Sequence, residues 1–139
     1  ACVMAGSDIV ALDATGRPRL DGLSFASTVA ALREDGTLVM ADCGSFEDAQ
    51  RAVDTGVDIV STTLAGYTGD RVKTDGPDLE LLAEVVAAFP DVPVICEGRV
   101  HTPEQAAAAI EVGAFAVIVG TAITHPTSIT TWFKAAVEG

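Results

Sequence analysis

Two short segments in the second half of the sequence carry residues suited to binding a phosphorylated molecule. Glu97, Gly98 and Arg99 follow the apolar run Val-Pro-Val-Ile-Cys, and Gly120 and Thr121 follow another apolar run. Glycine lets backbone N–H groups approach an anion because no Cβ blocks the way. We therefore expect Gly98, Arg99, Gly120 and Thr121 around a phosphate group. Either glycine alone could serve only a tight turn, and Arg99 could be a surface ion-pair partner.

Glu97 is the candidate acid/base residue. A carboxylate at the end of a buried strand needs hydrogen-bond partners or a raised pKa, and both conditions suit proton transfer. Side chains alternate between the two faces of a strand, so Asp13, Asp42 and Glu97, each near the end of an apolar run, can converge on one mouth. Asp13 and Asp42 could instead be helix caps or salt-bridge members. Neither has a histidine beside it, so neither is needed as a metal ligand. We expect no metal ion and no cofactor.

The elements that must position these residues alternate along the chain. Short β-branched runs predict strands over Asp8–Asp13, Leu38–Asp42, Asp58–Thr62, Val92–Glu97 and Phe115–Val119. Helical spacing predicts helices over Phe25–Glu34, Phe46–Thr55, Leu79–Phe89, Pro103–Val112 and about Thr127–Val137. The first four begin after the capping residues Ser24, Ser45, Asp78 and Thr102. Five βα units predict an α/β fold with a parallel sheet covered on both faces.

Two architectures accept five βα units. At about 28 residues per unit, an eight-unit (β/α)₈ barrel would take about 222 residues, which lies within the usual range of that fold. A flavodoxin-like doubly wound sheet would use the five strands as they stand. A phosphoacceptor receiver domain needs a lysine after the fifth strand, where this chain has Gly120 and Thr121. The polar and glycine residues at all five strand ends favour the barrel.

Composition excludes several classes of partner. The net charge is −12 with only eight Lys and Arg residues, which argues against nucleic acid. The longest apolar run, Ala114 to Val119, is far too short to cross a membrane. Cys2, Cys43 and Cys96 form no C-x-x-C pair, which predicts buried free thiols and a cytoplasmic location. Residues 1–6 contain neither a basic segment nor a starting Met, so we expect further sequence upstream.

Six segments in order resemble one family, the N-acetylmannosamine-6-phosphate 2-epimerases. They are Ile-Val-Ala-Leu-Asp-Ala-Thr (9–15), Val-Met-Ala-Asp (39–42), Ser-Thr-Thr-Leu-Ala-Gly-Tyr-Thr (61–68), Pro-Val-Ile-Cys-Glu-Gly-Arg-Val (93–100), Thr-Pro-Glu (102–104) and Val-Gly-Thr-Ala-Ile-Thr (119–124). The resemblance implies a (β/α)₈ TIM barrel that interconverts the 6-phosphates of N-acetylmannosamine and N-acetylglucosamine in sialic acid breakdown. It also implies that residues 1–139 are the C-terminal part of one barrel domain, strands four to eight, with about three N-terminal βα units absent.

The resemblance also assigns roles to residues. Inverting C2 requires removing a proton next to a latent aldehyde and returning it to the opposite face. In the family a lysine of the third strand does this with help from the glutamate that matches Glu97, and that lysine would lie upstream of Ala1, so this chain alone should be inactive. Asp13 and Asp42 would contact the sugar. Gly98, Arg99, Gly120 and Thr121 would lie near the phosphate.

One residue departs from the family pattern. After Ala-Ile-Thr and before Pro the family usually has Arg, whereas this chain has His125. An ordinary imidazole is mostly neutral at pH 7, so we expect His125 to bind phosphate weakly or in a pH-dependent way. The alternative is that His125 is a solvated residue at a helix start.

The connection between Leu64 and Pro77 is long for a βα loop. Such loops are commonly lids or substrate contacts, and Tyr67 could close over the sugar or pack the loop onto the barrel. Lys73 lies in this loop and is a poor substitute for the expected catalytic lysine. The partner we expect is a phosphorylated amino sugar. Whether a second copy of the protein forms a homodimer is left open. Another phosphate-binding barrel enzyme and a non-catalytic flavodoxin-like module remain the alternatives.

Overall fold

A single parallel sheet organises the computed structural model, which describes residues 1–69 and 71–138. Its strands are β1 (Ile9–Asp13), β2 (Leu38–Asp42), β3 (Ile59–Ser61), β4 (Val94–Glu97) and β5 (Ala116–Ile118). They lie in the order β1-β2-β3-β4-β5, so each strand pairs with the next one along the chain. This is the arrangement of successive strands in a (β/α)₈ barrel. A flavodoxin-like sheet would place the first strand between the second and the third, so that alternative is wrong.

The helices follow the predicted pattern closely. They are α1 (Phe25–Glu34), α2 (Phe46–Thr55), α3 (Leu79–Ala88), α4 (Pro103–Val112), the short α5 (Thr121–Thr124) and α6 (Pro126–Glu138). The predicted capping side chains Ser24, Ser45, Asp78 and Thr102 each accept the backbone N–H three residues further on. At α4 the Gln105 side chain accepts the backbone N–H of Thr102, which completes a capping box. Local capping signals therefore fix where the first four long helices begin.

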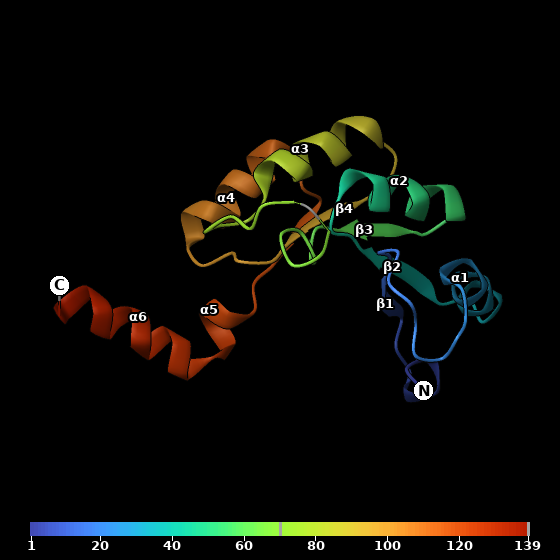
Figure 1. Ribbon diagram of the computed structural model, residues 1–139, viewed down its shortest axis with the longest axis horizontal. Helices are drawn as coiled ribbons and strands as arrows, with labels where there is room; N and C mark the ends of the chain where they lie inside the picture. The colour runs from blue at the N-terminus through green and yellow to red at the C-terminus, as the bar shows by residue number, and fades with distance from the viewer. Residues whose placement is uncertain (70, 139) are drawn as a thin grey trace.

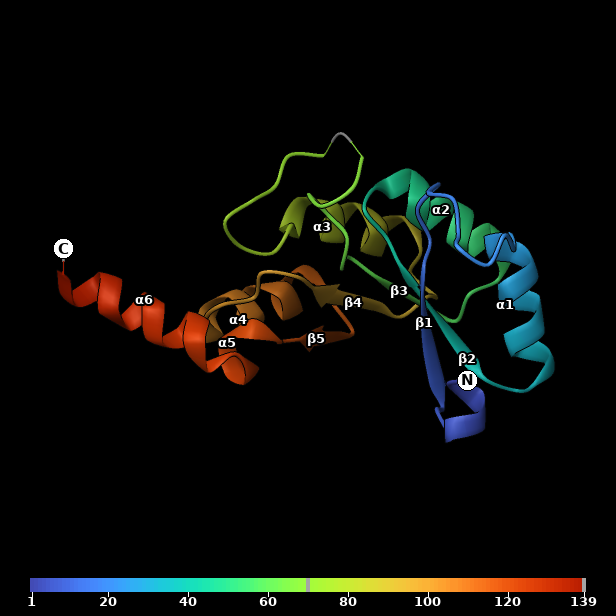
Figure 2. The same cartoon turned by 60° about the horizontal axis from the view of Figure 1, so that its bottom comes forward.

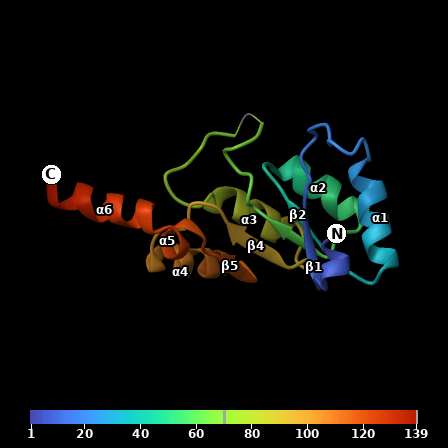
Figure 3. The ribbon, with the colours of Figure 1, turned by 90° about the horizontal axis from the view of Figure 1, so that it is seen from below.

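Helices α1 to α4 lie on one side of the curved sheet (Figures 1 and 3). The strand residues beneath them, such as Val39, Val60 and Cys96, are fully buried. The alternate residues Ile9 and Leu38 on the opposite face are 45% exposed. The prediction of a sheet covered on both faces is therefore wrong for the described residues. Successive right-handed crossovers that all advance in one direction place every helix on the same face.

Three features were not predicted. A 3₁₀ turn, η1, spans Val3–Ala5, and α5 is a separate four-residue helix before α6. Helix α6 extends away from the sheet (Figures 1 and 2). Its side chains Phe133 and Val137 are 72% and 86% exposed.

The predicted burial of the cysteines holds for two of the three. Cys43 and Cys96 are buried free thiols, whereas Cys2 is exposed. Burial raises the pKa of both buried thiols. Among the described helices, none combines the length and the apolar character that crossing a bilayer requires.

Candidate active site

The end of β3 holds Glu97 at the end of β4. The Thr62 side chain accepts the Glu97 N–H at 3.1 Å and donates to the Glu97 carbonyl at 3.0 Å. The hydroxyls of Thr63 and Ser61 donate to Glu97 Oε2 at 2.7 Å and 3.1 Å. Backbone and carboxylate of Glu97 are thus fixed by three consecutive residues. Such a half-buried carboxylate with a defined direction suits proton transfer.

Asp42 lies beside this group at the end of β2. The Thr63 hydroxyl is 3.1 Å from Asp42 Oδ1, so Thr63 contacts both carboxyl groups. Burial raises the pKa of Asp42 to about 6. The Thr63 hydrogen bond opposes the rise, and the charges of Glu97 and Asp13 add to it. The predicted convergence of Asp42 and Glu97 on one mouth of the sheet is therefore present.

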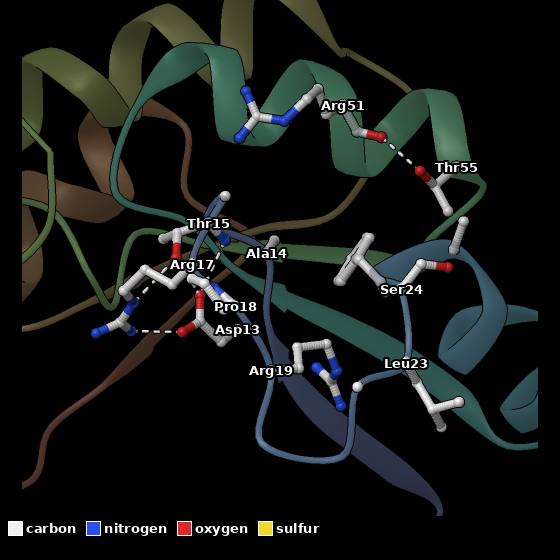
Figure 4. Close-up of a pocket in the computed structure, with 14 residues that line it drawn as sticks. Asp13, Ala14, Thr15, Arg17, Pro18, Arg19, Leu23, Ser24, Arg51 and Thr55 are labelled. Atoms are coloured by element: carbon white, nitrogen blue, oxygen red, sulfur yellow. Dashed lines mark hydrogen bonds and ion pairs between the residues drawn. The ribbon is translucent and has the colours of Figure 1, made fainter.

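Asp13 pairs in register with Asp42, at the end of β1. Its carboxylate accepts the N–H of Thr15 at 2.9 Å and the Thr15 hydroxyl at 2.6 Å, and it forms an ion pair with Arg17. Figure 4 shows Arg17 folded back toward Asp13 across the end of the strand. Burial opposes ionisation of Asp13, but the bonds from Thr15 and Arg17 outweigh it and lower the pKa of Asp13. Asp13 is thus a salt-bridge member, one of the alternatives considered above.

A cavity of about 230 Å³ opens between the ends of β4 and β5. It brings together six of the nine predicted site residues with several neighbours: Thr63, Tyr67, Glu97, Gly98, Arg99, Val100, His101, Ile118, Gly120 and Thr121. Gly98 has φ +100°, and a Cβ there would lie 3.4 Å from the Thr63 carbonyl oxygen. Its left-handed backbone favours glycine and lets the chain turn sharply into the cavity wall.

Arg99 attaches the loop between Leu64 and Pro77 to the wall of this cavity. Among the described residues, its guanidinium donates to the carbonyls of Ala65 (2.7 Å) and Gly76 (3.0 Å) and to the Thr74 hydroxyl (3.0 Å). The centre of the Tyr67 ring lies 5.0 Å from the Arg99 guanidinium carbon and 4.7 Å from the Lys73 ammonium nitrogen. Arg99 therefore borders the cavity while most of its guanidinium is engaged with the loop. The surface ion-pair alternative for Arg99 requires a carboxylate partner, and none of these three acceptors is a carboxylate.

His125 is not among the residues that line this cavity. Its Nδ1 lies 2.8 Å from the Ser128 hydroxyl oxygen and accepts the Ser128 N–H at 3.3 Å, at the start of α6. The ring is exposed. This placement fits the helix-start alternative for His125.

Ser61 and Thr63 are the residues that the sequence analysis missed. Both hydroxyls face the same side as Glu97, whereas Thr62 between them faces its backbone. The alternation of a strand end that reads Ser-Thr-Thr was the available signal. Within residues 1–69 and 71–138, no cluster of three or more His, Cys, Asp or Glu side chains is arranged to hold a metal ion.

Comparison with known proteins places this chain in one family. A family model described as "Putative N-acetylmannosamine-6-phosphate epimerase" matches residues 1–139. A Cutibacterium acnes protein named putative N-acetylmannosamine-6-phosphate 2-epimerase is 58% identical over 99% of this chain and 61% of its own length. A protein of the same name from Corynebacterium glutamicum strain R is 47% identical over 94% of this chain and 56% of its own length. The chain thus spans about 60% of the length of these relatives.

A solved structure supports the same assignment. The N-acetylmannosamine-6-phosphate 2-epimerase from Clostridium perfringens superposes with a TM-score of 0.93 at 41% identity, covering 97% of this chain and 58% of that one. The parallel five-stranded sheet is therefore a run of βα units of a TIM barrel, as predicted. The chain belongs to the family of N-acetylmannosamine-6-phosphate epimerases.

Proposed function

We propose that the complete protein interconverts N-acetylmannosamine 6-phosphate and N-acetylglucosamine 6-phosphate, as an isomerase of amino sugar and sialic acid breakdown. The observation that carries this proposal is the Glu97 carboxylate, held by Ser61 and Thr63 at the wall of a cavity that also contains Gly98 and Gly120. Membership of this family supports the proposed substrate class. The site supplies a fixed acid/base group beside candidate anion-binding backbone.

The reaction needs two groups that face opposite sides of C2. One group removes the C2 proton, which is acidic because the open-chain sugar carries an aldehyde at C1, and the electron pair moves into an enolate. A proton then returns to C2 on the other face, which inverts that carbon and leaves all other bonds unchanged. We assign Glu97 to one of these transfers. The second group is the lysine expected upstream of Ala1, in the third strand of the barrel.

The substrate's phosphate would lie against Gly98, Gly120 and Thr121. The cavity between the ends of β4 and β5 supports this proposal because glycine at two neighbouring strand ends allows close approach of an anion. Arg99 would add positive charge at the rim while holding the loop. Tyr67, whose ring borders the cavity, would contact the sugar, and Asp42 would accept hydrogen bonds from its hydroxyl groups.

Three further properties belong to this proposal. We expect a cytoplasmic enzyme, because Cys43 and Cys96 are unpaired thiols in the core. A homodimer is supported by α6, which extends from the sheet with Phe133 and Val137 exposed. We also expect that these five βα units are the C-terminal part of one barrel domain.

Hydrogen exchange at C2 tests the proposed reaction. The full-length protein is incubated with N-acetylmannosamine 6-phosphate in D₂O, and deuterium at C2 of both epimers is measured by NMR. Glu97→Gln keeps the size of the side chain but cannot carry the proton, so we expect formation of deuterated N-acetylglucosamine 6-phosphate to fall by about 10²- to 10⁴-fold. Another phosphate-binding barrel enzyme would leave C2 unlabelled.

A further inference from the structure

We propose that Thr63 is a positioning residue that couples Asp42 to Glu97, so that the two carboxyl groups hold one proton between them during the proposed epimerisation. The Thr63 hydroxyl oxygen lies 3.1 Å from Asp42 Oδ1 and 2.7 Å from Glu97 Oε2. No other described side chain has hydrogen bonds to both carboxyl groups. This inference rests on the proposed function and assigns that site a third member.

The number of available protons supports the coupling. Besides its contacts with the two carboxyl groups, the Thr63 hydroxyl oxygen lies 2.5 Å from the Ser61 hydroxyl oxygen, and Ser61 also contacts Glu97 at 3.1 Å. Two hydroxyl groups supply only two protons, which is fewer than these contacts need. A proton on one carboxyl group supplies a third. Compared with two ionised carboxylates, a pair that carries one proton and a net charge of −1 therefore leaves fewer of these four contacts without a proton.

The environment of Asp42 favours it as the resting place of that proton. Burial raises the pKa of Asp42 to about 6, so its protonated form persists to a higher pH than in an ordinary aspartic acid. The charged groups around the pair are Asp13 at the end of β1, which is paired with Arg17, and Arg99 at the rim of the cavity. The titratable ring of His101 lines the same cavity.

The hydroxyl can pass a proton without being consumed. Asp42 transfers its proton to Thr63 Oγ1 while the original Thr63 proton passes to Glu97 Oε2. Two O–H bonds break and two form, and the charge of the pair remains −1. This transfer loads the Asp42 proton onto Glu97 before Glu97 gives it to C2, after which the pair carries a charge of −2. In the reverse reaction Glu97 of that doubly ionised pair removes the C2 proton, and the reverse transfer returns it to Asp42.

Paired substitutions at Thr63 separate coupling from a structural role. In Thr63→Val the shape is kept and the hydroxyl is lost, and we expect kcat to fall by about 10- to 100-fold, as removal of a hydrogen bond to a charged group predicts. Thr63→Ser restores the hydroxyl, and we expect kcat within about fivefold of wild type, with the wild-type pH profile. A merely structural role would lower activity equally at every pH.

The pH profile of kcat/KM for the full-length enzyme is the decisive readout. We expect an inflection near pH 6 in wild type and in Thr63→Ser, and its loss in Thr63→Val and in Asp42→Asn. His101→Asn controls for the imidazole in the same cavity and should keep the inflection. An inflection retained in Thr63→Val, or absent from wild type, would overturn the coupling.

A titration independent of turnover separates this inference from the proposed function. Carbon-13 NMR of the side-chain carboxyl groups should show the Glu97 signal following the titration of Asp42 in wild type, and no longer following it in Thr63→Val. Absence of epimerase activity in the wild-type protein would contradict the proposed function. Independent titration of Asp42 and Glu97 would instead contradict the coupling. If Thr63→Val fails to fold, Asp42→Asn carries the test, because its Glu97 signal should lose the step near pH 6.

Discussion

Burial of the Asp42 carboxyl group makes its ionised form costly in the folded protein. Its pKa is raised from 3.8 to about 6, so its contribution to stability is complete below about pH 4 and is lost as pH rises through about 6. Asn keeps the shape without the charge. For Asp42→Asn we expect a free energy of unfolding about 1–2 kcal/mol above wild type at pH 8, a value discounted for partial exposure, and little gain at pH 4.

Asp13 provides the matched control for that measurement. Its pKa is lowered, because the hydrogen bonds from Thr15 and Arg17 outweigh burial, so its contribution is present above about pH 4 and is lost as pH falls. Asp13→Asn should therefore destabilise the full-length protein at pH 8. Urea denaturation of both variants at pH 4 and pH 8 measures the two signs. Shifts of the same sign at pH 8 would contradict this description of the two carboxyl groups.

His125 stands where the family usually has Arg, and its effect on substrate binding stays a prediction. We expect KM for N-acetylmannosamine 6-phosphate to rise from about pH 5.5 to 8, because only a protonated imidazole attracts phosphate. His125→Arg should lower KM at pH 8 by about three- to tenfold and flatten the profile. A flat wild-type profile would leave His125 with only its hydrogen bond to Ser128 at the start of α6.

The loop between β3 and α3 depends on Arg99 for its attachment to the cavity wall. The planar guanidinium donates to Ala65, Thr74 and Gly76 together, a geometry that an ammonium group cannot reproduce. For Arg99→Lys we expect amide hydrogen exchange in residues 65–77 to become about tenfold faster, with KM raised as Tyr67 loses its support. Arg33→Lys, an exposed substitution in α1, is the matched control. Unchanged exchange in Arg99→Lys would show that the loop is held elsewhere.

Local signals explain why the helices were predicted so closely. A capping side chain such as Ser45 or Thr102 satisfies the free N–H groups of the first turn from within its own helix, so the sequence alone contains the information. Helix α5 was not predicted, because four residues are too few to display a helical period. Thr63 was missed for a different reason: its partner Glu97 lies 34 residues away, and only the pairing of β3 with β4 brings them together.

The arrangement of the sheet also combines local features, which the sequence predicted, with long-range features, which it did not. Strand positions and the shared face of Asp13, Asp42 and Glu97 followed from alternation. The coverage of the sheet by helices on one face did not, since strands rich in apolar residues are compatible with either a doubly wound sheet or a barrel. Likewise, the sequence placed Arg99 near the cavity, but its engagement with the loop depends on three groups that are 23 to 34 residues away.

Helix α6 is the part of the molecule that a second copy would cover in the proposed homodimer. Phe133 and Val137 are exposed on a helix that extends away from the sheet. We expect the full-length protein to be a dimer by light scattering, and Phe133→Asp to weaken it by at least tenfold because a charge would be buried. Ala31→Asp, on an exposed position of α1, should leave the dimer intact. A monomeric wild-type protein at micromolar concentration would contradict the homodimer.

The transfer of a proton at C2 is the claim on which the functional account depends. The direct measurement is NMR of N-acetylmannosamine 6-phosphate in D₂O with full-length wild-type protein and with Glu97→Gln at equal, verified folding. The account predicts deuterium at C2 of both epimers with wild type, and about 10²- to 10⁴-fold slower formation of deuterated N-acetylglucosamine 6-phosphate with Glu97→Gln. Absence of C2 labelling by wild type, or undiminished formation of the deuterated second epimer by Glu97→Gln, would contradict it.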